Sequence, residues 1–315
     1  MKTYLVLGGS SFIGRAVISA LCKTDRVITT VRPDKQTESF EKGVRVMPLD
    51  FVNTVNFRPY LQGVDTVIHL VSTVVPEPGT ERVADDLRQN LMPTIRLLDA
   101  MAQCGTRKLL FISSGGTVYG EQGDDEVLGE THPTLPICSY GLCKLTIEKY
   151  LHLYHINHGL DYRVLRLSNV YGAKARAGQT QGLIPLIIDA ILNGRPISIW
   201  GSGEKTRDYI HINDVIDAVL RVDGYRGDER IFNVGSGVGE TIHDVIAKIA
   251  AVLDCRDFDV HYTRGRLCDV ESNVLNSELL RRCTGWQPKI SLEEGIRLLA
   301  AQQQNAEKFA ARGKI

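Results

Sequence analysis

The hydrophobic pattern at the start of the chain pairs a short apolar run with a helix-like spacing. Residues 4–7 form an apolar run of strand type, a glycine-rich stretch follows at residues 8–14, and apolar positions then recur with helical spacing. Similar strand-type runs return through the first half of the chain, at residues 26–31, 44–49, 65–71, 108–112 and 162–167. Because strands that alternate with helices form parallel sheets, the pattern predicts an α/β fold of the Rossmann type, a doubly wound parallel sheet with helices on both faces.

Helical spacing is clearest at residues 83–104, where apolar side chains recur at steps of three and four and Gly105 follows as a cap. Further helices are expected at residues 139–157, 183–192, 214–222, 241–253 and 292–309. The alternation becomes irregular after Gly172, although residues 207–235 still contain strand-type runs. We therefore expect a first domain at residues 1–172, to which the segment at 207–235 returns, and a smaller C-terminal α/β domain made mainly of residues 173–315.

Composition and charge then exclude several classes of protein. The 315 residues carry 37 basic and 37 acidic side chains, and this zero balance argues against a nucleic-acid or membrane-surface partner. No apolar run approaches the ~20 residues of a membrane span, and the first apolar segment is interpreted as a strand rather than as a signal peptide. The seven cysteines are scattered without a C-x-x-C pair, which favours reduced thiols in a cytoplasmic protein, and no metal site is expected.

The stretch Gly8-Gly9-Ser10-Ser11-Phe12-Ile13-Gly14 has the character of a phosphate-binding turn between a strand and a helix. Gly8 would allow a tight turn with positive φ, and Gly14 would let the helix lie close to the strand. The free N–H groups at the start of the helix would then face a phosphate. Glycine turns are also common without a ligand, but a turn directly after the first strand is where a doubly wound domain binds a dinucleotide.

Two further positions bear on the cofactor. At the end of the second strand a carboxylate would bind the ribose 2′-hydroxyl of NAD, whereas an arginine suits the 2′-phosphate of NADP. Arg32 stands there with Lys35 nearby, so this position favours NADP, with a solvated charge in a turn as the alternative. His69 lies inside the apolar run at residues 65–71 and is expected to be a core histidine near the cofactor rather than a proton shuttle.

Candidate catalytic groups follow the fifth strand and open the next helix. Ser114 and Thr117 come after the run at residues 108–112, at the edge where open α/β sheets bind ligands. Tyr140 and Lys144 are four residues apart, so they share one helix face. An ammonium beside a phenol lowers the phenol pKa, as a general acid and base acting on a sugar hydroxyl requires. The alternative is an ordinary surface pair, but the glycine turn and the strand-end hydroxyls upstream favour the chemical role.

Together these motifs resemble those of the extended short-chain dehydrogenase/reductases of the nucleotide-sugar class, and nearly the whole chain is similar to UDP-hexose 4-epimerases. The glycine stretch is similar to the family's G-x-x-G-x-x-G loop with Ser11 for the middle glycine, and residues 140–144 are similar to Y-G-x-S-K with Cys143 for serine. Residues 165–172 and 196–210 resemble its L-R-x-x-N-V-Y-G and P-I-x-I-x-G-x-G-x-x-x-R-D-Y-I stretches, and residues 113–120 match its S-S-x-x-V-Y-G stretch with loose spacing. The family's catalytic hydroxyl falls on Gly115 here, so Thr117, or else Ser114, is expected to take that role.

The resemblance also implies which residues bind ligands. Cofactor contacts are implied for Gly8, Ser10, Ser11, Phe12, Ile13, Gly14, Arg32, Asp50, Phe51, Leu70, Val71, Asn90, Tyr140 and Lys144. Substrate contacts are implied for Asn169, Arg207, Arg266, Asp269 and Asn273. The two arginines would hold the nucleotide diphosphate and Asp269 the ribose. Asn273 stands at the position of a size gate, where its short side chain would leave room for an N-acetyl group.

The activity that the resemblance implies is a reversible inversion at C4 of a nucleotide-linked hexose through transient oxidation. Tyr140, as phenolate, would take the 4-hydroxyl proton while a hydride passes to the nicotinamide, and Lys144 would lower the Tyr140 pKa. Epimerases of this family usually bind NAD, although Arg32 favours NADP. The acid pair of the 4,6-dehydratases is missing beside Gly115, so dehydration is not expected. The alternatives are an NADP-dependent 4-keto-sugar reductase with the same pair and a non-catalytic dinucleotide-binding sensor. A homodimer is implied, paired through the helices near residues 90–104 and 140–157.

Overall fold

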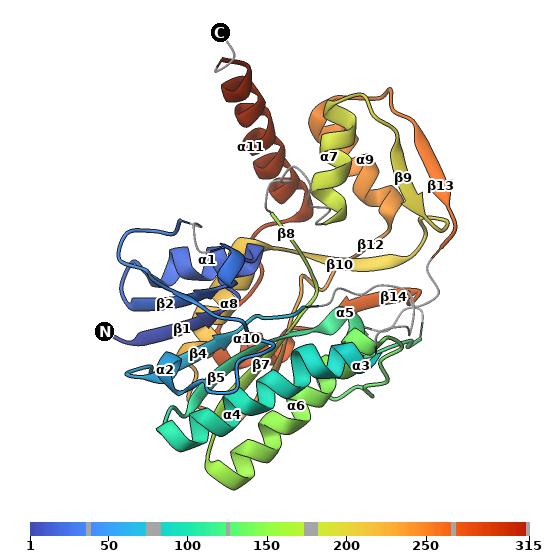
Figure 1. Ribbon diagram of the computed structural model, residues 1–315. Helices are drawn as coiled ribbons and strands as arrows, with labels where there is room; N and C mark the ends of the chain where they lie inside the picture. The colour runs from blue at the N-terminus through green and yellow to red at the C-terminus, as the bar shows by residue number, and fades with distance from the viewer. Residues whose placement is uncertain (36–38, 74–82, 124–126, 173–181, 266–268, 313–315) are drawn as a thin grey trace.

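The centre of the fold is a seven-stranded sheet in which every neighbouring pair is parallel (Figure 1). The computed structural model describes residues 1–35, 39–73, 83–123, 127–172, 182–265 and 269–312. Across the sheet the strands are β3 (Arg45–Pro48), β2 (Arg26–Val31), β1 (Thr3–Leu7), β4 (Thr66–His69), β5 (Lys108–Ser114), β7 (Asp161–Leu167) and β11 (Ile231–Val234). The strand order reverses between β1 and β4, and doubly wound sheets bind ligands beyond the carboxyl ends of the strands at such a switch point. The predicted Rossmann fold is confirmed.

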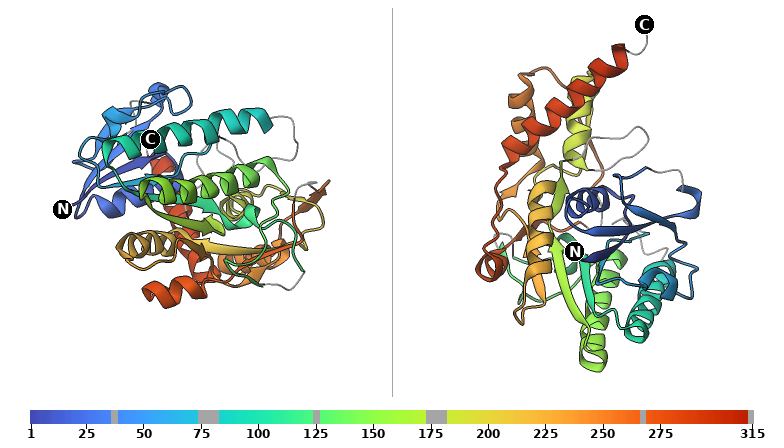
Figure 2. Two further views of the ribbon diagram at one scale, coloured as in Figure 1. Left: turned by 90° about the horizontal axis from the view of Figure 1, so that it is seen from below. Right: turned by 90° about the vertical axis from the view of Figure 1, so that its left-hand side faces the viewer.

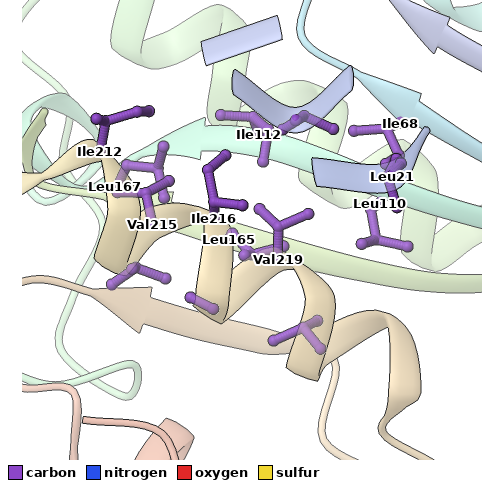
Figure 3. Packing of buried hydrophobic residues seen from close by; sticks show 14 of the residues in the cluster. Leu21, Ile68, Leu110, Ile112, Leu165, Leu167, Ile212, Val215, Ile216 and Val219 are labelled. Carbon is purple, nitrogen blue, oxygen red and sulfur yellow. The ribbon is translucent and has the colours of Figure 1, made fainter. Parts of the chain in front are cut away.

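Helices cover both faces of this sheet and bury two separate apolar clusters. One face carries α1 (Phe12–Leu21), α8 (Ile212–Gly224) and α10 (Glu278–Thr284), and the other carries α2 (Arg58–Leu61), α4 (Met92–Cys104) and α6 (Ser139–His158). Figure 3 shows part of the first cluster, where Val215 and Val219 of α8 lie against the strands beside Leu165 of β7. Because the central strands are buried on both faces, their apolar runs are continuous rather than alternating.

A smaller part of the structure lies above the large sheet in the view of Figure 1. It contains α7 (Leu183–Leu192), α9 (Ile242–Leu253) and α11 (Leu292–Arg312), which share a third apolar cluster, and the parallel pair β9 (Ile197–Trp200) and β13 (Val260–Thr263). A small mixed sheet lies between the two parts and is built from β6 (Val127–Leu128), β8 (Asn169–Tyr171), β10 (Thr206–His211), β12 (Gly239–Glu240) and β14 (Ser272–Leu275). Because β8 follows β7 directly and β11 returns to the large sheet, the chain passes between the two parts more than once (Figure 2).

The helix predicted at residues 83–104 is divided in the structure. α3 (Val83–Asp86) runs into a π-helical turn at Leu87–Leu91 before α4 begins, and the Met92 N–H donates to Leu87 O, five residues back. Pro93 accounts for the change of spacing, because it has no N–H to donate and its ring crowds the preceding turn. Asn90 lies in this wider turn and is buried. Such turns are frequent at functional sites.

Short elements were missed by the sequence pattern. α5 (Gly115–Val118) and α10 are too short to show a helical period, and β6 and β12 have two residues each. In the part of the chain that the structure describes, no helix is both long and apolar enough to cross a membrane.

Candidate active site

The glycine-rich turn connects β1 to α1 and leaves one hydroxyl unsatisfied. Gly8 has φ +87°, as expected, and a side chain at Gly14 would lie within 2.8 Å of the Gly9 Cα. Ser11, which replaces the family's middle glycine, is the N-cap of α1, because its Oγ accepts the Gly14 N–H at 3.0 Å. The Ser10 Oγ is buried and has no hydrogen-bond partner among the described residues. The turn therefore combines an unsatisfied hydroxyl with a helix N-terminus, as a phosphate site requires.

Three residues expected to contact the cofactor, Arg32, Asp50 and Phe51, follow the ends of β2 and β3. The Arg32 side chain is 69% exposed, and its Nε lies 3.8 Å from Asp34. Asp50 accepts hydrogen bonds from the side-chain amide and the N–H of Asn53 at 2.8 and 3.1 Å, which keep the pKa of the Asp50 carboxyl below its ordinary value. Phe51 is packed in the core beneath this edge. Both charged side chains are therefore open to solvent, whereas Phe51 supports the loop.

His69 is a satisfied core histidine, as expected. Its Nδ1 accepts the Val71 N–H at 3.3 Å, so the proton lies on Nε2, which donates to Thr94 Oγ1 at 3.0 Å. Burial lowers the pKa of His69 to about 3, so the ring is neutral and does not exchange protons near neutral pH. The bond orients the backbone at Leu70 and Val71, which lies against the turn: a side chain at Gly8 would come within 3.2 Å of the Val71 nitrogen.

Tyr140 and Lys144 lie in the first two turns of α6 and are not the surface pair considered as the alternative. Only 5% of Lys144 is exposed. Its Nζ donates to Ile112 O at 2.9 Å and lies 4.8 Å from the centre of the Phe111 ring. The same nitrogen lies 5.7 Å from the centre of the Tyr140 ring. Burial lowers the pKa of Lys144 to about 8, so its ammonium sits near its titration point.

The expected lowering of the Tyr140 pKa is wrong for the protein alone. Burial raises the pKa of Tyr140 to about 12, and a side-chain hydrogen bond with Ser114 offsets part of that rise. The Lys144 ammonium is bonded to a strand carbonyl and lies beside the phenol ring, so its charge does not compensate for the lost hydration of the phenolate. The phenol therefore holds its proton until another positive charge approaches.

Of the candidate hydroxyls at the end of β5, that of Ser114 interacts with Tyr140, whereas those of Ser113 and Thr117 have different surroundings. Ser113 Oγ donates to Glu148 at 2.5 Å. Thr117, the favoured candidate, lies in α5 with its Oγ1 buried and without a hydrogen-bond partner among the described residues. At Gly115 a side chain would come within 3.0 Å of Leu275, so packing against β14 takes the space that a hydroxyl residue would need.

Four residues expected to bind the cofactor line one small cavity: Val71, Asn90, Tyr140 and Lys144. The remaining walls are Ser72, Cys143 and Ile147. Asn90 Oδ1 accepts the Thr73 N–H at 2.9 Å, and Asn90 Nδ2 donates to Asp86 O at 3.3 Å. The buried Cys143, which replaces the family's hydroxyl residue, donates its thiol to the same carbonyl at 3.8 Å. The π-helical turn and α6 thus bring these groups together beyond β4.

The residues that are predicted to contact the substrate, and that the structure describes, lie on or beside the small mixed sheet. Arg207 of β10 donates to Val270 O at 2.7 Å and forms an ion pair with Asp269. Asn169 of β8 donates to Asp208 O at 3.1 Å. Asn273 of β14 lies directly opposite Arg207 in the parallel pairing. Arg266 lies outside the described residues, so its expected contact remains a prediction.

Two residues that sequence reasoning did not single out help to build the site. Asp208 is fully buried and accepts hydrogen bonds from the loop after β11 and from β14, through the Ser236 hydroxyl at 2.6 Å and the Leu275 N–H at 3.2 Å. Its position next to Arg207 in the R-D-Y-I stretch is the sequence feature from which Asp208 could have been predicted as a site residue. Gly9 is needed because a side chain there would lie within 2.7 Å of Ile18, which only the folded structure reveals.

Residues 4–235 match the family model described as the NAD dependent epimerase/dehydratase family. The chain belongs to this family. A related dTDP-4-dehydro-6-deoxyglucose reductase from Escherichia coli is 32% identical over 314 residues, which cover 93% of this chain and 94% of that protein. Among solved structures, a UDP-glucose 4-epimerase from Thermotoga maritima with UDP-glucose has a TM-score of 0.89 at 28% identity and covers 96% of this chain and 99% of its own. The Thermus thermophilus UDP-glucose 4-epimerase complex with NAD has a TM-score of 0.83 at 29% identity, covering 95% and 98%.

The residues present in this member of the NAD dependent epimerase/dehydratase family are compatible with a dinucleotide. The unsatisfied Ser10 hydroxyl and the start of α1 offer donors to a pyrophosphate. A side chain at Gly14 would collide with the turn, and one at Gly8 would press on the Val71 nitrogen at 3.2 Å with the backbone at φ +87°, so both positions favour glycine. At the carboxyl edge of the sheet, the small cavity beside Tyr140 and Lys144 is lined by four residues for which a cofactor contact is predicted.

Proposed function

We propose that this chain is a nucleotide-sugar 4-epimerase of the UDP-glucose or UDP-N-acetylglucosamine type that works with bound NAD. The observation that carries the proposal is the placement of Tyr140 between the Ser114 hydroxyl and the buried Lys144, next to the cavity lined by Asn90. This arrangement supports the proposal because a phenol with a hydroxyl and a cation nearby, at the ligand-binding edge of the sheet, can serve as an acid and base. Similarity to epimerase structures over almost the whole chain supports the same activity.

When bound, NAD supplies a hydride acceptor at its nicotinamide and, in its oxidised form, a positive charge. Tyr140 exchanges the proton of the sugar 4-oxygen. Because burial raises the pKa of Tyr140, nearby positive charge must favour the phenolate before the phenol oxygen can accept that proton. Ser114 offsets part of the rise in the Tyr140 pKa, and we assign the hydrogen bond to the reacting oxygen to Thr117, whose buried Oγ1 has no partner among the described residues. Lys144 adds its charge below the phenol ring while Ile112 O holds it in place.

The nucleotide half of the substrate is held by groups far from the reacting carbon. The Arg207 guanidinium offers the fork geometry that phosphate oxygens accept. We assign Arg266 to the same diphosphate, Asp269 to the ribose, and Asn169 to the nucleotide contact that the family resemblance implies. Remote binding energy of this kind positions the sugar without holding it in one orientation, as inversion at C4 requires.

A second candidate function is an NADP-dependent 4-keto-sugar reductase. It is favoured by the exposed Arg32 at the end of β2 and by the similarity to the E. coli reductase. It would use the same Tyr140 and Lys144 pair but would consume reduced cofactor in each turnover. A dinucleotide-binding sensor without catalysis is the third alternative, and it gives Tyr140 no proton to transfer.

We also propose a homodimer in the cytoplasm. α4 and α6 lie side by side on one face of the sheet (Figure 1), and the surface of α6 exposes Leu142, Leu153 and Ile156. Leu87 and Met92 are exposed at the start of the neighbouring helix. A second copy covering this apolar face would remove it from water. The described cysteines are all free thiols, in keeping with a reducing compartment.

The experiment that tests the activity starts from the purified, undenatured protein. Denaturation and analysis of the released dinucleotide should yield NAD, and the intact protein should interconvert UDP-glucose or UDP-N-acetylglucosamine with its C4 epimer without net cofactor turnover. Tyr140→Phe should lower kcat roughly 10²–10⁴-fold, the range of a lost general acid and base, while UDP binding is unchanged. Stoichiometric NADPH oxidation with a 4-keto sugar would instead establish the reductase. A protein that binds a dinucleotide but converts no sugar, and whose dinucleotide binding is unchanged by Tyr140→Phe, would support the sensor.

A further inference from the structure

Lys205 lies beside the proposed nucleotide site, at a position that the family stretch at residues 196–210 leaves unspecified. Its side chain is only 21% exposed, and its Nζ lies 3.1 Å from Glu271 Oε1 and 3.9 Å from Asp269 Oδ2. The same nitrogen donates a hydrogen bond to Asp269 O. Lys205 therefore contacts the residues that precede β14 through their backbone as well as through their carboxylates.

The terminal nitrogens of Arg207, which the proposed function gives to the nucleotide diphosphate, are already bonded within the protein. Nη1 donates to Thr206 O at 2.7 Å and to Glu271 O at 3.4 Å. Nη2 donates to Val270 O at 2.7 Å and forms the ion pair with Asp269. These bonds use the four hydrogens of the two terminal nitrogens. A phosphate that binds the Arg207 fork through two bonds must therefore displace at least one of these acceptors.

Of these four acceptors, the Asp269 carboxylate is the one that a phosphate can replace. Its side chain is 37% exposed and can rotate, whereas the other three acceptors are backbone carbonyls. The backbone here has bonds that do not involve the Arg207 side chain: the Thr206 N–H donates to Glu271 O at 2.9 Å, and the Glu271 N–H donates to the Glu121 carboxylate at 3.2 Å. An exchange of Asp269 for phosphate on Arg207 therefore needs only side chains to move.

We infer that Lys205 is a positioning residue for the nucleotide, because it keeps a cation beside Asp269 when the diphosphate binds Arg207. Without Lys205, the exchange would leave a carboxylate without its cation next to a phosphate of like charge, which is unfavourable. With Lys205 in place, Asp269 stays held and can accept a hydrogen bond from the ribose. This inference rests on the proposed function, and it adds the residue that makes the Arg207 and Asp269 contacts compatible.

The role of Lys205 has two consequences that distinguish it from general electrostatic attraction. A nucleoside without phosphate does not compete for Arg207, so the ion pair between Arg207 and Asp269 stays intact and Lys205 contributes little to binding. A lysine that only attracted phosphate from a distance would act whether or not Asp269 carries a charge. The contribution of Lys205 should therefore require both a phosphate on the ligand and the carboxylate at Asp269.

The first experiment compares UDP with uridine by calorimetric titration of the purified protein. Lys205→Met should weaken UDP binding about tenfold, the size of one hydrogen bond to a charged group, and leave uridine binding unchanged. The ratio of the two Kd values does not depend on the fraction of folded protein. Lys205→Arg keeps the cation and should restore UDP binding. The matched control is Lys2→Met, which removes an ammonium 2.7 Å from Asp223 but leaves Asp223 its ion pair with Lys108, and it should change neither ligand.

The second experiment repeats Lys205→Met in protein that carries Asp269→Asn. No carboxylate is then left to be held, so the substitution should weaken UDP less than twofold. If Lys205→Met leaves the ratio of the UDP and uridine Kd values unchanged, or costs UDP as much in the Asp269→Asn protein, the inference is overturned. Absence of UDP binding to the unmodified protein would overturn both the inference and the proposed function. A protein that shows the expected binding ratios but does not interconvert UDP-sugars would overturn the proposed function alone, because these ratios do not depend on turnover.

Discussion

The Glu148 carboxylate and the Arg166 guanidinium form a buried ion pair between α6 and β7. Arg166 Nη2 lies 2.7 Å from Glu148 Oε2, and the two side chains are 2% and 1% exposed. Ser113 Oγ donates to the same carboxylate, and Arg166 Nη1 donates to the Tyr119 hydroxyl at 3.0 Å. Glu148 is one helical turn beyond Lys144. The pair therefore sets the position of α6 against the strand ends, and with it the approach of Lys144 to the sheet.

Removal of one member of this pair should destabilise the protein strongly. Glu148→Gln leaves the Arg166 charge buried without its partner, which costs about 3–5 kcal/mol in comparable buried pairs. Urea denaturation monitored by circular dichroism measures the loss. The double variant Glu148→Met with Arg166→Met should be less destabilised than Glu148→Gln, since no charge is left buried. Equal stability of the Glu148→Gln variant and the unmodified protein would contradict the structural role of the pair.

The low pKa of Lys144 predicts how stability depends on pH. Burial places the folded-state pKa at about 8, below the ordinary value of 10.5. Below pH 8 both states hold the proton, so the buried ammonium lowers stability in full; between pH 8 and 10.5 the folded state has lost the proton while the unfolded state keeps it. The free energy of unfolding should therefore rise across this window relative to that of Lys144→Met. A pH-independent difference between the two proteins would show that the ammonium is not desolvated.

The same titration should appear in the activity. If Lys144 acts through its charge, kcat should fall as pH rises through about 8, the value at which the buried ammonium loses its proton. A pH profile of kcat at saturating substrate measures this limb. A profile that stays flat to pH 10 would mean that the charge of Lys144 is not needed, and that the residue acts by packing alone.

The glycine turn should fail when its close approach is blocked. In Gly14→Ala the added carbon would lie 2.8 Å from the Gly9 Cα and 2.9 Å from Ser11 Oγ, so α1 must move away from the turn. We expect loss of about 1–3 kcal/mol of stability, as for other overpacked sites, and loss of dinucleotide from the purified protein. Gly224→Ala, made in open space, is the control and should retain the dinucleotide. Full dinucleotide content in Gly14→Ala would argue against phosphate binding at this turn.

Arg207 should contribute to nucleotide affinity more than an ordinary paired arginine. It lies beside Asp269 on the small sheet, where the nucleotide diphosphate is proposed. Arg207→Gln should weaken UDP binding roughly tenfold or more, since hydrogen bonds to charged groups are worth about 1.5–3 kcal/mol. The control is Arg230→Gln, which breaks the 2.8 Å ion pair between Arg230 and Asp161 in another part of the protein. Similar UDP affinity in both variants would remove Arg207 from the binding site.

Local patterns in the sequence were sufficient for the fold class and for several site elements. Apolar runs bounded by helical spacing follow from backbone periodicities of two and 3.6, so the order of β1, α1 and β2 could be predicted. The backbone demands of Gly8 and Gly14 follow from steric rules that act within a few residues, and the structure has both. The four-residue spacing of Tyr140 and Lys144 placed them on one helix face for the same local reason.

Other features depend on residues that meet only after folding. The Tyr140 pKa is raised because the tertiary structure buries the phenol, and no spacing along the chain measures desolvation. Asn273 reaches the Gly115 carbonyl across 158 positions of sequence, and Leu275 fills the space at Gly115 from the same strand. The sequence by itself determined which elements form and which chemical groups they carry. The tertiary structure decided which of those groups are dehydrated, paired or left free, because burial and long-range contacts are properties of the packed chain.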